Sequence, residues 1–130
     1  GVSFARELWL ELQVFDGSQV YFSSGLLDSH SSDLSSDVEI FNSVLYDANG
    51  NSVVSVTDVI NMSNNSLQTN EARVKTFSAP VAMAEDSVTA TARLLFRPFS
   101  PSKLRGDHQD LLLNLPVITV DSLSITIPIP

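Results

Sequence analysis

Apolar and polar residues alternate along residues 6–15, close to the start of the chain. The apolar side chains at every second position are Leu8, Leu10, Leu12 and Val14. A spacing of two is that of side chains on one face of a β-strand. Asp16-Gly17-Ser18 then supplies residues that favour a tight turn, and a second apolar segment follows over residues 20–28. The chain is therefore expected to open with a β-hairpin.

Shorter segments with the same character follow the hairpin. Further strands are predicted over residues 40–46, 53–56, 57–62, 73–79, 87–97 and 118–129. Polar loops are expected at 25–37 and 61–70, a tight turn at 47–51, and one short helix near 102–114. Seven to eight strands separated by turns favour an all-β fold, namely an Ig-like or fibronectin-like antiparallel β-sandwich.

A single β-sandwich domain is expected to occupy residues 1–130, as a piece of a larger protein. Its core is predicted from residues that share one face of their strands. These residues are Leu8, Leu10, Leu12, Val20, Phe22, Ala92, Leu94, Ile125 and Ile127.

Composition narrows the range of partners. The chain has 15 acidic and 7 basic residues, a net charge of −8, and no cysteine. Basic side chains must neutralise phosphates in a nucleic-acid complex, so a nucleic-acid partner is not expected. The absence of cysteine excludes disulfides, thiolate metal sites and the C-x-x-C-H attachment of covalent haem. No apolar run approaches the roughly 18 residues of a membrane-spanning helix, and membrane insertion is not expected.

Candidate chemistry is sparse, and no catalytic, metal-binding or cofactor-binding residue is assigned. His30 and His108 are the only histidines, and each lies in a polar loop where solvated side chains outnumber haem ligands. Residues 47–51 alternate oxygen-bearing side chains as calcium loops do, but Ser52 stands where such a loop needs glycine, so a hairpin turn is favoured. A calcium site at the aspartates of the first loop stays open. These are Asp28, Asp33 and Asp37.

Trp9 departs from the pattern of its strand. It lies opposite the leucines, between Glu7 and Glu11, and is therefore expected on the outer surface. An exposed indole favours a cover, either an arginine from a neighbouring strand or a second domain. The candidate docking surface consists of Trp9, Tyr21, Arg93 and Arg97.

Three runs of the chain resemble one known family. They are Arg-Glu-Leu-Trp-Leu-Glu-Leu at 6–12, Ser-Gly-Leu-Leu-Asp at 24–28 and Thr-Ala-Arg-Leu-Leu-Phe-Arg at 91–97. The turns at 16–17 and 47–50 and the run Leu-Pro-Val-Ile at 115–118 agree in order. Together they resemble a β-sandwich domain associated with bacterial extracytoplasmic multihaem c-type cytochromes. A His-, Pro- and Gly-containing segment that usually precedes the first run in that family is either missing or cut off here.

The resemblance implies a non-catalytic module in extracytoplasmic electron transfer, periplasmic or at the cell surface. Its partner would be the haem-bearing domain or subunit of the parent protein, and its role would be assembly or docking. The alternative is a secreted Ig-like or fibronectin-like domain for adhesion or carbohydrate binding. Haem-attachment motifs in the full-length protein would favour the first interpretation, and tandem sandwich repeats would favour the second.

Overall fold

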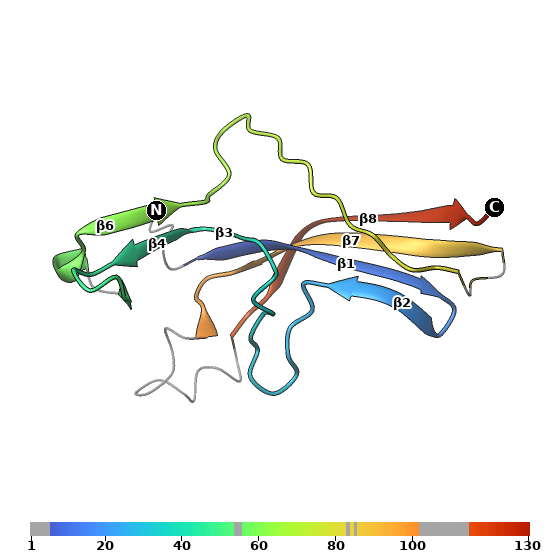
Figure 1. Ribbon diagram of the computed structural model, residues 1–130, viewed down its shortest axis with the longest axis horizontal. Coiled ribbons are helices and arrows are strands. Elements are labelled where there is room, and N and C mark those ends of the chain that lie inside the picture. Colours follow the sequence, from blue (N-terminus) through green and yellow to red (C-terminus); the bar gives the residue numbers. More distant parts are fainter. Residues whose placement is uncertain (1–5, 54–55, 83, 85, 102–114) are drawn as a thin grey trace. The chain divides into compact units, whose positions relative to one another are not determined.

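The fold is all-β in a computed structural model, which describes residues 6–53, 56–82, 84, 86–101 and 115–130 (Figure 1). Its strands form two antiparallel sheets, and a single turn of 3-10 helix, η1, spans Val56–Asp58. This class agrees with the sequence and is compatible with a β-sandwich. The helix expected near 102–114 lies outside the described residues.

The larger sheet contains the longest strands of the chain. Its order is β2-β1-β7-β8, and β3 also pairs with β1. The bounds of these strands are Glu7–Asp16 for β1, Gln19–Ser24 for β2, Ile40–Phe41 for β3, Ser87–Arg97 for β7 and Ile118–Pro128 for β8. β1, β2, β7 and β8 therefore form where period-two alternation is clearest in the sequence.

The opening hairpin is confirmed. β1 and β2 pair antiparallel, with Val14 opposite Phe22 and Phe15 opposite Val20. Tyr21 is the extra residue of a β-bulge between these two pairs. A bulge redirects the side chain of the extra residue and increases the twist of its strand. Gly17 has φ +53° in the turn, a conformation that glycine adopts at little cost.

The smaller sheet is formed by β5, β4 and β6, in that order. β4 spans Ser43–Tyr46, β5 spans Ser52–Val53 and β6 spans Asn61–Asn64. The segment 40–46, expected as one strand, is therefore divided at Asn42, and its two parts enter different sheets. Asn65 holds this division, because its N–H donates to Asn42 O at 2.8 Å and its side-chain amide donates to Ile40 O at 2.9 Å.

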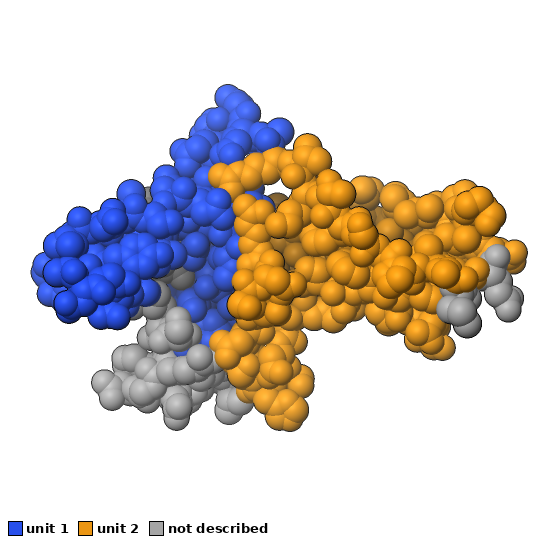
Figure 2. Space-filling model, viewed as in Figure 1, with its two compact units in different colours: residues 1–8, 40–72, 96–118 blue, residues 9–39, 73–95, 119–130 orange. Residues whose placement is uncertain are grey.

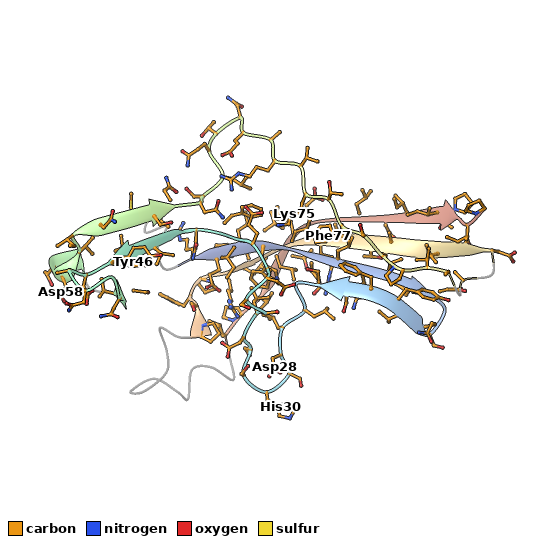
Figure 3. The ribbon with its side chains drawn as sticks, viewed as in Figure 1. Asp28, His30, Tyr46, Asp58, Lys75 and Phe77 are labelled. Carbon is orange, nitrogen blue, oxygen red and sulfur yellow. The ribbon has the colours of Figure 1, made fainter. Side chains whose placement is uncertain are left out.

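Two segments differ from the sequence-based expectation. A strand was expected over 57–62 and a loop from 61, but Val56–Asp58 forms η1 and Asn61–Asn64 forms β6, because the backbone of β6 bonds to β4 whatever its side chains are. Residues 73–79 were expected as a strand but have no ladder partner in the structure. Lys75 Nζ bonds to Glu39 at 3.2 Å, and the Phe77 ring packs 5.9 Å from that of Phe22 (Figure 3). Side-chain contacts hold this segment.

The buried core also differs from the expectation. Its apolar members are Trp9, Val14, Leu45, Val88 and Leu95. The predicted core residues that prove half-buried are Leu8, Leu10, Leu12, Phe22, Ala92 and Leu94. Val20, Ile125 and Ile127 are exposed, and their predicted burial is wrong. They lie on β2 and β8, which are the outer strands of the larger sheet, where neighbours cover only one side.

The chain divides into two compact units, coloured separately in Figure 2. Unit 1 comprises residues 1–8, 40–72 and 96–118, and it contains the smaller sheet. Unit 2 comprises residues 9–39, 73–95 and 119–130, and it contains β2 and most of β1, β7 and β8.

Gly25, just after β2, is expected to be the glycine least tolerant of substitution. Its φ is +77°, and a Cβ there would lie 2.4 Å from Leu10 O. Gly50 has φ +80° with open space around it, so Gly50→Ala isolates the conformational cost, about 1–2 kcal/mol. Gly25→Ala adds an overpacking cost of about 1–3 kcal/mol. Urea unfolding of both variants measures the difference, and equal losses would contradict the close approach.

Candidate functional site

Trp9 is fully buried, so its predicted outward placement is wrong. Its exposed fraction is 0%, and its indole Nε1 donates a hydrogen bond to Gly25 O at 2.9 Å. Gly25 lies in direct contact with β1. A Cβ atom at this position would lie 2.4 Å from Leu10 O and 2.9 Å from Glu11 Cα. The chain leaving β2 therefore touches β1 at Gly25, and the indole binds the carbonyl oxygen of this residue.

Glu11 explains why the Trp9 face can be buried. Its carboxylate accepts two hydrogen bonds from Arg93, from Nε at 2.8 Å and from Nη2 at 2.6 Å. A charged carboxylate can leave water only if such bonds replace its hydration. The Glu11 side chain is 8% exposed and that of Arg93 is 44% exposed, so the arginine keeps part of its own hydration. Because Glu7 and Glu11 are charged, the sequence pattern predicted that their face of β1 is exposed, whereas it is buried.

Glu7 forms a second ion pair, within unit 1. Arg97 Nε donates to Glu7 Oε2 at 2.6 Å, and both side chains are buried. The desolvation of both charges offsets much of their attraction, so the pair adds little to the free energy of unfolding. Its main effect is to fix how Glu7 and Arg97 are placed relative to each other. Removing Arg97 would leave the buried Glu7 carboxylate without this counterion.

The four residues of the candidate docking surface therefore have different positions. Trp9 and Arg97 are buried and cannot contact a partner from a surface. Arg93 is partly exposed but holds Glu11. Tyr21 is half-buried at the bulge of β2, an outer strand. Arg93 and Tyr21 retain a predicted docking role, while Trp9 and Arg97 are structural.

A cavity of about 290 Å³ lies beside Glu7 in unit 1. Its apolar walls come from Leu8 and two phenylalanines, and its polar walls come from Glu7 and neighbouring side chains. The lining residues are Arg6, Glu7, Leu8, Phe41, Asn42, Ser66 and Phe96. Glu7 already accepts a hydrogen bond from Arg97, which fixes the direction of its carboxylate at the wall of the cavity.

The loop after Gly25 is closed by Asp28. The Asp28 carboxylate accepts the N–H groups of Ser31 and His30 at 2.7 and 2.9 Å, and these bonds hold its pKa below the usual value. The exposed His30 imidazole lies at the tip of this loop, labelled in Figure 3, and contacts Ser29 Oγ at 3.0 Å. His108 lies outside the described residues.

Asp47 organises the turn between β4 and β5. Its Oδ1 accepts the N–H of Asn51 at 2.9 Å and that of Asn49 at 2.8 Å, and these bonds lower its pKa. The carboxylate is therefore directed at its own turn, and the hairpin interpretation of residues 47–51 is confirmed. Among the described residues, no group of three or more His, Cys, Asp or Glu side chains is arranged to hold a metal ion.

The exposed apolar row on β8 is the surface that sequence reasoning missed. The sequence pattern assigned Ile125 and Ile127 to the core because they alternate with polar residues. Alternation reports that a strand has two different faces, but not whether a neighbour covers either one. Together with Leu123 they lie exposed on the outermost strand of the larger sheet.

Trp9→Ala is expected to destabilise the protein more than Leu10→Ala. Trp9 is fully buried and binds Gly25, so its truncation should lower the free energy of unfolding by about 3–5 kcal/mol. Leu10 is only half-buried, and its truncation should cost about 1–2 kcal/mol. Chemical denaturation of both variants gives the comparison. A larger loss for Leu10→Ala would restore the leucine face as the principal core.

Asp47→Asn is expected to destabilise the protein at neutral pH and to match wild type in acid. A lowered pKa in the folded state adds stability above the unfolded pKa, near 3.9, and that stability is lost as the pH falls through the folded pKa. Asparagine resembles the protonated aspartate, so the two unfolding midpoints should converge once the pH falls below the lowered pKa of Asp47 in the folded state. Asp58→Asn, which removes a charge from another exposed position, is the control. A difference that is independent of pH would contradict the role of the Asp47 charge.

No protein-family model matches this chain, and no curated protein or solved structure shows significant similarity to it. Within the described residues, no helix is long and apolar enough to cross a membrane.

Proposed function

We propose that this chain is a non-catalytic module of an extracytoplasmic multihaem c-type cytochrome, with an Ig-like or fibronectin-like β-sandwich fold. Its role is assembly with, or docking of, the haem-bearing domain of the parent protein. The chain itself contributes no cofactor ligand.

The observation that supports this proposal is that the runs on which the resemblance rests bind one another. Trp9 of the first run donates to Gly25 of the second, and Glu11 of the first run binds Arg93 of the third. Glu7 and Arg97 join the first and third runs again. Residues that hold strands together in this way are those of a scaffold.

The proposal can be tested with the full-length protein and with the isolated chain. The full-length sequence should contain C-x-x-C-H motifs, and the isolated chain, mixed with the haem-bearing portion, should co-migrate with its Soret absorbance in gel filtration. The isolated chain, incubated with haem, should carry no Soret absorbance through gel filtration. A parent protein without such motifs, or with tandem sandwich repeats, would favour the adhesion alternative.

Tyr21 offers a matched pair of variants for this binding experiment. Tyr21→Ser removes the aromatic side chain at the bulge of β2, and we expect it to weaken co-migration at least about tenfold, as for aromatic side chains at interface hot spots. Tyr46→Ser alters the other tyrosine of the chain, which is also half-buried but lies on β4, and should leave binding unchanged. Melting temperatures of both variants separate loss of docking from loss of fold.

A further inference from the structure

The C-terminal half of β8 is an exposed apolar edge. Leu123, Ile125 and Ile127 are 64%, 48% and 40% exposed. In the described part of the chain, β8 has β7 on one side and no strand on the other (Figure 1). An open edge of this kind is a template for pairing with another strand.

Two contacts, one between β8 and β7 and one just beyond their paired ends, indicate which backbone groups of β8 face the open edge. Ile129 N–H donates to Asp86 O at 2.8 Å, and the hydroxyls of Thr91 and Ser124 lie 3.4 Å apart. Both contacts fit one antiparallel register. Every second residue of an antiparallel strand bonds to the same neighbour, so Ser124 and Thr126 direct their N–H and C=O groups outward.

Two residues bound the stretch that is open to pairing. Asp121 Oδ1 accepts the N–H of Ser122 at 2.8 Å, which occupies one outward group with the strand's own side chain. Pro128 has no N–H, and in the same register its position faces outward, where proline leaves the β7 ladder intact. Charged residues and prolines are the usual devices that limit edge pairing. Residues 123–127, between them, contain neither.

The sequence of residues 123–127 is self-complementary. Leu-Ser-Ile-Thr-Ile alternates apolar and hydroxyl side chains with the same pattern in both directions from Ile125. A two-fold interface requires this property, because each contact from residue i to residue j is repeated from j to i. With Ile125 on the axis, Leu123 faces Ile127 of the second copy and Asp121 faces Ile129, so no like charges lie opposite each other.

We propose that two copies of this chain associate by antiparallel pairing of their β8 strands, centred on Ile125. Ser124 and Thr126 exchange roughly four backbone hydrogen bonds across the axis, and three apolar pairs form on one face. A standard interface has about ten hydrogen bonds, so this dimer is weak and reversible. It does not depend on the haem-bearing partner proposed above.

Introduced cysteines test the register, because the chain has none of its own. Ile125→Cys places two thiols opposite each other, with Cβ atoms about 4.5–5.5 Å apart in a directly facing pair. Leu123→Cys, the matched control on the same face, places its thiol four residues from its counterpart, roughly 13 Å away. Under mild oxidation, we expect a disulfide-linked dimer from Ile125→Cys at least about ten times faster than from Leu123→Cys.

Sedimentation equilibrium tests the association itself. The unaltered chain should show a monomer–dimer equilibrium below about 1 mM, tightened by salt because each copy carries a charge of −8. Ile125→Lys should weaken it at least about tenfold. Val20→Lys, which also replaces an exposed β-branched apolar residue by lysine but on β2, should not. Thr126→Pro removes only an outward N–H and replaces the lysine variant if that variant fails to fold.

Three outcomes would overturn the proposal. The first is a chain that stays monomeric over this range, which would leave the edge to a different partner. The second is equal cross-linking of the two cysteine variants. The third is equal weakening by Ile125→Lys and Val20→Lys, which would indicate a general charge effect.

Discussion

The pairing of β1 with β7 through buried carboxylates is the constraint on which the larger sheet depends. Glu7 meets Arg97 and Glu11 meets Arg93, and both contacts fit one antiparallel register. A slip of one residue would turn these side chains to the opposite face, and a slip of two would leave buried charges unpaired. The ion pairs therefore act on specificity: they penalise every register but one, whatever they add to the net free energy of unfolding.

Trp9 fixes the position of the chain segment that follows β2 relative to this pair of strands. Its indole lies on the same face of β1 as Glu11, opposite Leu95 in the register set by the ion pairs, and it binds Gly25 O at 2.9 Å. Gly25 meets two demands at once, a positive φ and a contact with β1 too close for any side chain. Only glycine satisfies both. The loop that follows β2 therefore begins at Gly25, in contact with β1.

The sequence allowed the strands to be predicted better than their faces. β1, β2, β7 and β8 follow period-two alternation, which is a local property and is visible without the fold. The face of β1 that is buried depends on its neighbour: Arg93, 82 positions away along the chain, makes burial of Glu11 possible. β6 was not predicted as a strand over its full length, because its sequence is mostly polar and its strand structure depends on pairing with β4. Trp9 and Arg97 were wrongly placed on the candidate docking surface, because the prediction took the buried face of β1 to be the exposed one.

The two edges of the larger sheet are protected to different degrees. β2 is a six-residue strand with a bulge at Tyr21, and both shortness and a bulge discourage a further strand from pairing. β8 is an 11-residue strand whose protective residues, Asp121 and Pro128, stand toward its ends. A chain under selection only to avoid edge pairing would place a charge among the exposed apolar residues at the middle of its longest edge. Because the middle of β8 alternates apolar and hydroxyl residues instead, its composition favours a strand that is kept available for one partner in one register.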